Sequence, residues 1–394
     1  MRAQRVYGSL RRSLGVIGVW VAALSSAGCG AEFDSISQVK QLRVLGVKKS
    51  SPYARPGDSV ELEMMYHDGG SERARELEVM WLSGCENPPA DLYELCLELL
   101  GPALSNPDAA GPPPETDPDA PRPPPETDPD EDASLNALFR GGVEAKLGRV
   151  SLGPGVALGF KRSFTLEVAE DIISKRPPPS DPRLTRYGLN YVFFAVCAGE
   201  LHLDLDSGSF PVECLDKDGN RLGTEDFVVG YSAVYAYDKL TNNNPRISGF
   251  EVGGDRLPRD QYCVGSDCEV TEPDPKRKCE KADPRVQACA DEDSDDCPKL
   301  SIRPLIDPRS VELDGVLTVS QGADVDEQMW LNYHSDRGKF TFDLSLVNDA
   351  QSGFKRDIET EFVAPEAKGP TQVWTVVRDN RGGAEWARFQ ICVE

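Results

Sequence analysis

Hydrophobic and polar residues alternate along several stretches of the chain, which predicts strands with one buried face. In the segment 59–66, Val60, Leu62 and Met64 alternate with glutamates. A period of two residues is typical of a half-buried strand. The preceding segment 54–59, ARPGDS, carries a Pro-Gly pair and predicts the turn that leads into this strand.

The same pattern recurs along most of the chain. Segment 191–198, YVFFAVCA, is apolar on both faces and predicts a central strand, whereas 90–100 is the best helix candidate. Gly382 and Gly383 between the last two strands can take positive φ and predict a hairpin turn. Further strands are predicted at 42–47, 76–82, 164–168, 227–238, 247–252, 300–306, 316–321, 329–334, 339–346, 371–379 and 384–393. Such short strands predict an all-β fold of two antiparallel sandwiches.

Two unusual inserts and a turn predicted at Asn242–Pro245 divide this pattern. The octamer PPPETDPD occurs at 112–119 and again at 123–130, and proline with acid cannot form a packed core. We predict a signal peptide at 1–28, a lipidated cysteine with its tether at 29–38, a first sandwich at 39–240 with a disordered Pro/acidic insert at 107–132, and a second sandwich at 245–394 with a cysteine-rich insert at 255–298.

The N-terminus predicts export and a lipid anchor. Residues 1–15 contain four arginines and no acid, and residues 16–24 are apolar. A basic head and a short apolar core are typical of a secretion signal and are too short to span a membrane. Cys29 follows Ala-Gly, which resembles a bacterial lipobox, although Ser26 stands where leucine is usual. The alternatives are an ordinary signal peptide, with Cys29 later paired in a disulfide, and a twin-arginine signal at RRSL.

The other ten cysteines favour the same oxidising compartment. They are Cys85, Cys96, Cys197, Cys214, Cys263, Cys268, Cys279, Cys289, Cys297 and Cys392. An even number in an exported protein predicts disulfides. Proximity favours Cys85–Cys96 and Cys197–Cys214, and the last six leave 15 possible pairings. This parity also favours lipidation of Cys29.

Charge excludes some partners. The net charge is −23, and removing the four arginines of residues 1–28 leaves −27. Such a chain should repel nucleic acid and anionic membrane. Acidity suits cationic ligands or Ca²⁺, or simply a solvated surface. Segments 204–208, 216–219 and 291–296 cluster carboxylates, but none matches an EF-hand loop, and DKDG at 216–219 predicts a turn.

Candidate catalytic chemistry is sparse. The three histidines, His67, His202 and His334, are isolated in sequence, and we expect each at the surface. The motifs HExxH and GxSxG do not occur. The cysteine spacings lack the CxxC pairs of zinc ribbons. We therefore predict no catalytic residue, no metal and no cofactor, and a protein that is not an enzyme.

A family resemblance is carried by structural motifs. The segments LRVLGVKKSSPYARPGDSVELE, YVFFAVCAGEL, GKFTFD and VWTVVRDNRGGAEWARFQICV resemble lipoproteins of the myxobacterial cell envelope. The resemblance implies immunoglobulin-like or polycystic-kidney-disease-type sandwiches over most of 39–250 and 299–394. It covers turns, core strands and the terminal hairpin, and it implies no catalytic residue.

These observations predict a lipid-anchored envelope protein with a non-catalytic binding or structural role. Gly30 lacks the aspartate that often retains lipoproteins at the inner membrane, so resemblance to that sorting rule favours the outer membrane. We expect the N-terminal lipid anchor to attach the protein to the membrane. We expect a protein or carbohydrate partner to bind the long loops at 86–160 and 253–298. The alternatives are a component of a secreted carbohydrate- or protein-processing enzyme system and a passive spacer.

Overall fold

The computed structural model describes residues 37–70, 75–96, 157–203, 211–268 and 277–394. Every described helix and strand belongs to one compact unit, which ends at Glu394. The predicted signal peptide, the lipidation site Cys29 and the repeat insert 107–132 lie outside the described residues.

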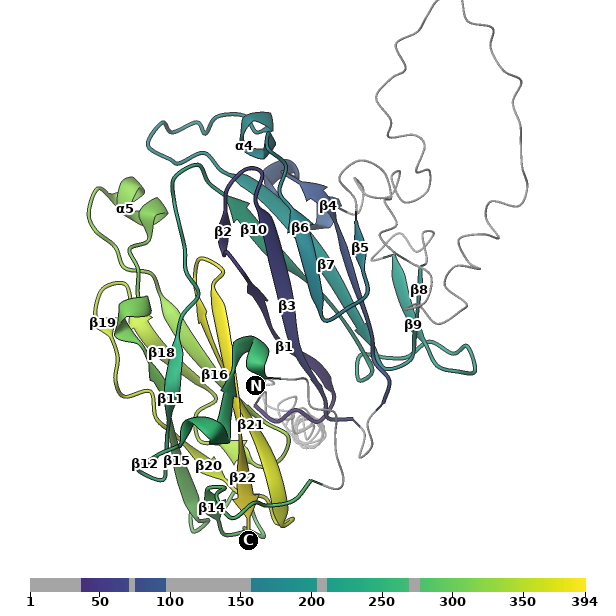
Figure 1. Cartoon of the computed structure of the whole chain (residues 1–394), viewed down its shortest axis with the longest axis vertical. Coiled ribbons are helices and arrows are strands. Elements are labelled where there is room, and N and C mark those ends of the chain that lie inside the picture. Colours follow the sequence, from purple (N-terminus) through teal and green to yellow (C-terminus); the bar gives the residue numbers. More distant parts are fainter. Residues whose placement is uncertain (1–36, 71–74, 97–156, 204–210, 269–276) are drawn as a thin grey trace, which may run out of the picture. The chain divides into compact units, whose positions relative to one another are not determined.

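The strands between Leu42 and Ala236 that the structure describes form two sheets, which pack face to face as an immunoglobulin-like sandwich (Figure 1). One sheet has the order β1(Leu42–Lys49), β3(Ser59–Asp68), β6(Ser163–Glu167). The other has the order β2(Tyr53–Ala54), β10(Phe227–Ala236), β7(Gly188–Cys197), β4(Glu78–Glu86), β5(Leu158–Gly159). β2 runs parallel to β10, and the other neighbours are antiparallel. β1 and β2 are consecutive in the chain, and each forms an edge strand of a different sheet.

The alternation in β3 produces the core of this sandwich. Val60, Leu62 and Met64 are fully buried, which confirms the pattern read from the sequence. Each such side chain contributes roughly 1.5–3 kcal/mol by leaving water. Trp81 of β4 is also fully buried, and its indole Nε1 donates a hydrogen bond of 2.8 Å to the carbonyl of Lys161.

β7 is buried on both faces, as its apolar sequence predicts. Val192 and Phe194 face the core between the sheets, whereas Tyr191 and Phe193 join a second cluster on the outer face. Two disulfide-bonded segments contribute to this outer cluster. They are the segment ending at Cys96 and the hairpin β8(Glu200–Leu203)–β9(Val212–Leu215).

The described strands between Ile247 and Val393 form a second sandwich of the same class. One sheet has the order β12(Asp255–Arg256), β11(Ile247–Val252), β15(Lys299–Ile306), β20(Thr360–Val363), β17(Lys339–Phe340). The other has the order β13(Tyr262–Val264), β22(Ala384–Val393), β21(Gly369–Asp379), β16(Met329–Ser335), β18(Leu344–Asp349), β19(Gly353–Phe354), with β14(Arg285–Val286) parallel to β22. The fold is therefore all-β, with two sandwiches.

The predicted hairpin joins β21 and β22. Gly382 adopts φ +91°, as expected for this turn. Gly383 is needed for a different reason, because a Cβ there would lie 2.1 Å from Oδ2 of Asp379. Glycine is therefore favoured at 382 by the positive φ, and at 383 by the close approach of the Asp379 carboxylate to its backbone.

Three sequence-based elements are corrected. Segment 316–321 was expected to be a strand, but α5(Gly315–Gln321) is a helix, because Asp314 caps its first amides and Gly322 ends it in the left-handed conformation. Segment 339–346 is divided between β17 and β18. Within 90–100, residues 94–96 are helical, whereas the 3₁₀ turn Pro89–Asp91 precedes them and 97–100 lie outside the described residues.

The remaining short helices are α4(Ile172–Lys175) and the 3₁₀ turns Arg259–Gln261, Gly265–Asp267 and Pro308–Ser310.

The two sandwiches pack against each other through a buried apolar cluster. Leu45 and Met65 of the first sandwich contribute to it together with Trp374 and Trp386 of the second, all nearly or fully buried. The Trp386 indole Nε1 donates 2.8 Å to the carbonyl of Gly265. Because two tryptophan rings are buried in it, the contact between the sandwiches resembles a protein core.

The asparagines of the connecting segment fix this contact further. Asn242, Asn243 and Asn244 follow the first sandwich directly. The Asn242 side chain donates to the Asp379 carboxylate at 3.3 Å, and the Asn243 side chain donates to the Glu312 carboxylate at 2.5 Å. The Asn244 side chain donates to the Lys49 carbonyl at 2.7 Å and accepts from the Ala384 amide at 3.0 Å. The segment predicted as a turn is therefore a hydrogen-bonded joint.

A buried ionic cluster lies beside this joint. The Arg381 side chain is 2% exposed and bonds to the fully buried Glu327 and to Glu312, at 2.5 and 2.9 Å. Its guanidinium also donates to the carbonyls of Thr241 and Leu313. Arg381 thereby connects β22's hairpin to the segment that joins the sandwiches.

Candidate functional site: a tyrosine surface on the first sandwich

All ten cysteines of the described region form disulfides. The pairs that proximity favoured, Cys85–Cys96 and Cys197–Cys214, are both present. The other pairs are Cys263–Cys268, Cys279–Cys392 and Cys289–Cys297. Five disulfides place this part of the chain in an oxidising, extracytoplasmic compartment. Within the described ranges, no helix has the length and apolar character needed to cross a membrane.

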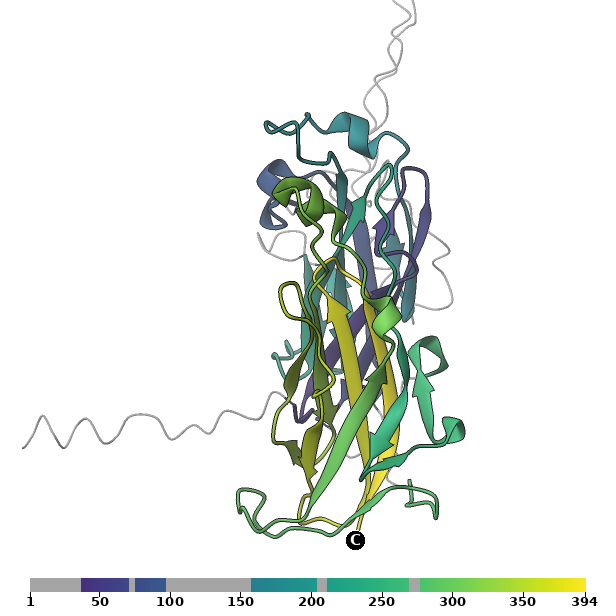
Figure 2. The same cartoon turned by 90° about the vertical axis from the view of Figure 1, so that its left-hand side faces the viewer.

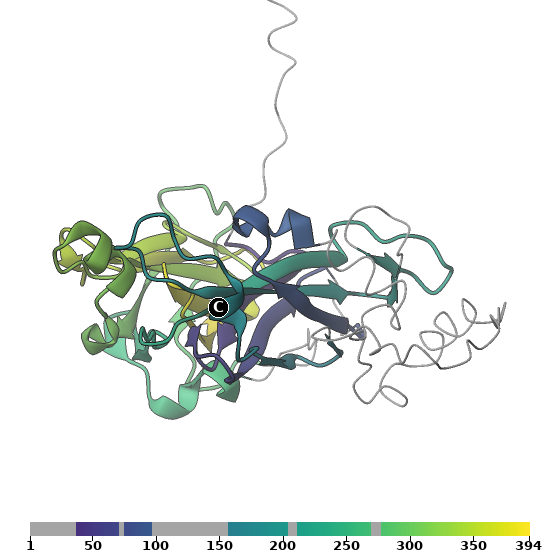
Figure 3. The same cartoon turned by 90° about the horizontal axis from the view of Figure 1, so that it is seen from above.

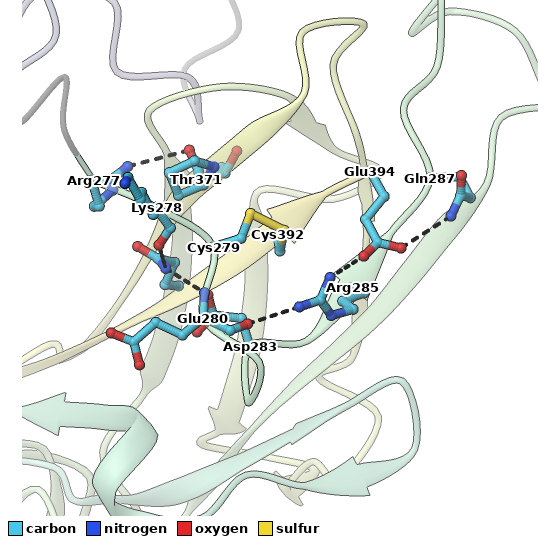
Figure 4. The surroundings of a disulfide bond; sticks show 12 residues. Arg277, Lys278, Cys279, Glu280, Asp283, Arg285, Gln287, Thr371, Cys392 and Glu394 are labelled. Atoms are coloured by element: carbon cyan, nitrogen blue, oxygen red, sulfur yellow. Dashed lines mark hydrogen bonds and ion pairs between the residues drawn. A yellow bond between two sulfur atoms is a disulfide. The ribbon is translucent and has the colours of Figure 1, made fainter.

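The cysteine-rich insert is tied to the last strand of the second sandwich. Cys279 is bonded to Cys392 of β22 (Figure 4), and β13 and β14 both pair with β22. Gln390 donates to Asp283 at 2.7 Å. In Figure 2 this part of the chain crosses the end of the second sandwich near the C-terminus. The described parts of the insert therefore cover one edge of a sheet.

The polar clusters singled out in the sequence do not converge. Asp216 accepts hydrogen bonds from the amides of Asp218 and Asn220, which makes DKDG the predicted turn. Segment 204–208 lies outside the described residues. Among the residues that the structure describes, no group of three His, Cys, Asp or Glu side chains is placed to hold a metal ion.

The expectation for the histidines was wrong at two of three positions. His67 and His334 are buried, and His67 packs on Trp374 with ring centroids 4.5 Å apart. His202 is partly exposed, at 30% of its side chain, and its ring lies 3.7 Å from Glu200. Tertiary packing between the sandwiches, which sequence order does not reveal, accounts for the burial of His67.

Backbone strain is concentrated in one short segment of the first sandwich. Asn87, Ala90 and Asp91 adopt φ of 45°, 55° and 58°, and they are the non-glycine residues with positive φ in the described region. Such conformations cost about 1–3 kcal/mol each and persist where surrounding contacts enforce them. Strain of this kind is concentrated at binding and catalytic sites in proteins. The segment 87–96 is therefore the strongest candidate on backbone grounds.

Several contacts hold this segment in place. The Cys85–Cys96 disulfide closes it. The backbone amide of Asn87 donates to the Leu189 carbonyl at 2.8 Å, and the Asn87 side-chain oxygen accepts from the Leu189 amide at 3.0 Å. The side-chain amide of Asn87 donates to the carbonyl of Ile172 at 2.8 Å. Figure 3 shows the segment on the side of β7 and β10 that faces away from β1 and β3.

The strained segment presents an aromatic surface. Tyr93 stacks on Tyr231 of β10, with ring centroids 4.3 Å apart, and Tyr191 meets Tyr231 edge-on at 5.3 Å. Tyr93 is 37% exposed and Tyr231 44% exposed, beside the exposed Leu92 and Val229. We call Leu92, Tyr93, Val229 and Tyr231 the tyrosine surface.

A polar network lies under the tyrosine surface. Asp91 accepts from the Arg176 guanidinium at 2.7 Å and from the Tyr187 hydroxyl at 2.5 Å, and its carbonyl accepts from the Tyr191 hydroxyl at 2.8 Å. Burial acts to raise the pKa of the Asp91 carboxyl, but the hydrogen bonds from Arg176 and Tyr187 outweigh it and hold that pKa below its usual value. The carboxylate is therefore ionised and orders the rings above it.

The tyrosine surface suits recognition. Exposed, rigid aromatic rings supply large contact areas with little side-chain entropy to lose, which is why tyrosine is enriched at binding surfaces. The apolar pattern at 227–238 predicted the strand but did not indicate the surface. One signal was available, because Tyr231, Tyr235 and Tyr237 are spaced four and two residues apart and so share a face of the strand and its continuation. Tyr93 could not be placed there from sequence order.

Comparison with known proteins gives no family. No family model matches the sequence, and no curated protein is significantly similar to it. Solved structures with some similarity include two of Escherichia coli alpha-2-macroglobulin. The elastase-activated form has a TM-score of 0.18 at 8% identity, covering 92% of this chain and 22% of that one, and the native form has 0.20 at 10%, covering 90% and 17%. Latent PorU from Porphyromonas gingivalis has 0.17 at 7%, covering 91% and 24%.

The chain spans less than a quarter of the length of each of these structures. TM-scores of 0.20 or less assign the chain to no family and carry no functional argument.

Proposed function

We propose that this chain is a non-catalytic binding protein of the cell envelope, held to the outer membrane by a lipid on Cys29. The tyrosine surface of the first sandwich binds the partner, which is a protein or a carbohydrate. The observation that carries the proposal is the strained segment 87–96, which fixes Tyr93 on Tyr231 in an exposed position.

Rigidity supports this proposal. The two sandwiches share a buried tryptophan contact and a hydrogen-bonded joint, so the surface is presented by one compact unit. Recognition surfaces gain affinity when little has to be ordered on binding.

The lipid anchor is tested by the intact mass of the membrane-extracted protein. The proposal predicts a chain that begins at Cys29 and carries a diacylglyceryl group and an acyl chain. Reduction should add ten hydrogens, because five disulfides are present. An unmodified chain cut elsewhere would contradict the anchor.

The binding role is tested with the extracted protein in lipid nanodiscs, fluorescently labelled and added to envelope fragments. Tyr93→Ser/Tyr231→Ser should lose at least tenfold in affinity, since central aromatic residues contribute about 2 kcal/mol or more each. Phe342→Ser/Leu344→Ser is the matched control, because these side chains are 64% and 56% exposed on the second sandwich. Equal binding by both variants would contradict the proposal. Protease or glycosidase treatment of the fragments separates a protein from a carbohydrate partner.

A further inference from the structure

β10 has an open edge beside the tyrosine surface. It pairs with β7 over its whole length, from Phe227 to Ala236. On its other side β2 pairs with Tyr235 and Ala236 alone. Residues 227–234 form no ladder with a second strand among those that the structure describes. β1 nevertheless lies beside both ends of this stretch, because Leu42 donates to the carbonyl of Glu225 and Lys49 to the carbonyl of Ala233.

The direction of the backbone groups follows from two hydrogen bonds. The Tyr237 amide donates to the carbonyl of Ala54 in β2, at 2.9 Å, and the Ala233 carbonyl accepts from the Lys49 ammonium at 2.8 Å. In an antiparallel ladder, backbone groups alternate between the two sides of the strand. The amides and carbonyls of Val229 and Tyr231 therefore point to the open side.

The edge is covered at Ala233, whose carbonyl accepts from the buried Lys49 ammonium, and its sequence offers little protection before that residue. Residues 227–236, FVVGYSAVYA, contain no charge and no proline, and their register with β7 has no bulge. Long, flat, uncharged edges are templates for another strand, and exported proteins normally block them. The stretch of this edge around the exposed Val229 and Tyr231 is therefore suited to pairing with an added strand.

Charge indicates what kind of strand. Exposed Glu225 precedes β10, exposed Asp238 follows it, and exposed Glu94 neighbours Tyr93. The cations nearby include the exposed Lys239 and the buried Lys49, which bonds to the Ala233 carbonyl and interacts with Asp379. The mature chain is also strongly acidic as a whole. A cationic segment is attracted by these carboxylates, and a lysine or arginine over the tyrosine rings gains a cation–π contact.

We infer that β10 binds an extended, cationic segment of a partner protein as an added strand, with its basic side chains against the tyrosine surface. Main-chain pairing with Val229 and Tyr231 supplies affinity, and the rings and flanking acids select the side chains. This inference rests on the proposed function and narrows its partner to a peptide segment.

The test is hydrogen exchange, read by mass spectrometry, on the full chain in nanodiscs. The probe is an octapeptide of alternating threonine and valine between two terminal lysines. At millimolar peptide, exchange at 227–233 should slow at least tenfold, with little change at β18. A peptide with terminal glutamates should bind at least tenfold more weakly, and one N-methylated on the pairing amides should give no protection. No protection at 227–233, or equal protection by the N-methylated peptide, would overturn the inference.

Two variants test the same bonds from the side of the protein. Val229→Pro removes an amide that points to the open side, whereas Phe342→Pro places the same residue at an exposed position of the second sandwich, away from β10. The first should abolish protection, and the second should retain it. If Val229→Pro unfolds, the N-methylated peptide still tests the pairing on the unaltered chain.

Two outcomes separate this inference from its alternatives. Concentration-dependent dimers of the native chain that Val229→Pro abolishes would show a second copy at the edge, and would overturn the cationic partner. If Tyr93→Ser/Tyr231→Ser loses envelope binding while the peptide protects no amide of the native β10, strand addition is overturned and the proposed function stands.

Discussion

The buried pair of Arg381 and Glu327 gives a quantitative stability prediction. Arg381→Met leaves Glu327, whose side chain is fully buried, without its cationic partner. Removing one partner of a buried ion pair costs about 3–5 kcal/mol, because the remaining charge stays desolvated. We expect the free energy of unfolding at pH 8 to fall by about that amount.

The pH dependence follows from the same pair. Burial raises the pKa of Glu327 from 4.5 to about 7, although Arg381 opposes the change. A folded-state pKa above the unfolded value means that the folded chain binds the proton more tightly. The stabilisation from proton binding by Glu327 in the folded chain is fully present below about pH 4.5 and is lost as the pH rises through about 7. The deficit of Arg381→Met should therefore shrink as the pH falls from 8 to 5.

Guanidinium unfolding followed by tryptophan fluorescence, with the disulfides intact, measures these quantities. Arg381→Met/Glu327→Leu is the key comparison, because it removes both charges and should recover most of the loss. Arg309→Met is the exposed control, since its side chain is 88% exposed and its pair with Asp307 should be worth under about 1 kcal/mol. A cost below about 1 kcal/mol for Arg381→Met, or no recovery in the double variant, would refute the reasoning.

Three further predictions concern other contacts. Cys279→Ala/Cys392→Ala opens a loop of 113 residues and should cost about 4–5 kcal/mol in the same unfolding assay. Trp386→Ala removes a fully buried ring from the contact between the sandwiches and should cost about 3–5 kcal/mol, with a cost below 1 contradicting that contact. Burial lowers the pKa of Lys49 from 10.5 to about 8, so the folded form binds its proton more weakly. The native chain should therefore gain stability relative to Lys49→Met between pH 8 and 10.5, measured as a difference in melting temperature, and a constant difference would contradict this.

Much of the β-structure could be predicted because it is local in origin. The alternation in 59–66 and the apolar run 191–198 reported which faces are buried. Segment 316–321 was misread because its valines and threonine favour strands, whereas the capping by Asp314 and Gly322 determined the helix. Cap residues were thus more informative there than side-chain type.

The long-range features could not be read in the same way. Cys279–Cys392 joins residues that are 113 positions apart, and nothing in their spacing distinguishes this pair from the alternatives. The asparagines 242–244 were interpreted as a turn, although their partners come from both sandwiches. Tyr93 meets Tyr231 only because segment 87–96 folds back over β7 and β10. Such contacts depend on tertiary structure.

The most direct test of the account is residue-specific photo-cross-linking in the cells that make the protein. A photoreactive amino acid is placed at Val229, in the tyrosine surface, and separately at the more exposed Phe342 as the control. The account predicts a discrete protein adduct from position 229 that the lysine-flanked octapeptide competes away, and no such competed adduct from position 342. Equal adducts from both positions, or an adduct from position 229 that the peptide does not reduce, would contradict it.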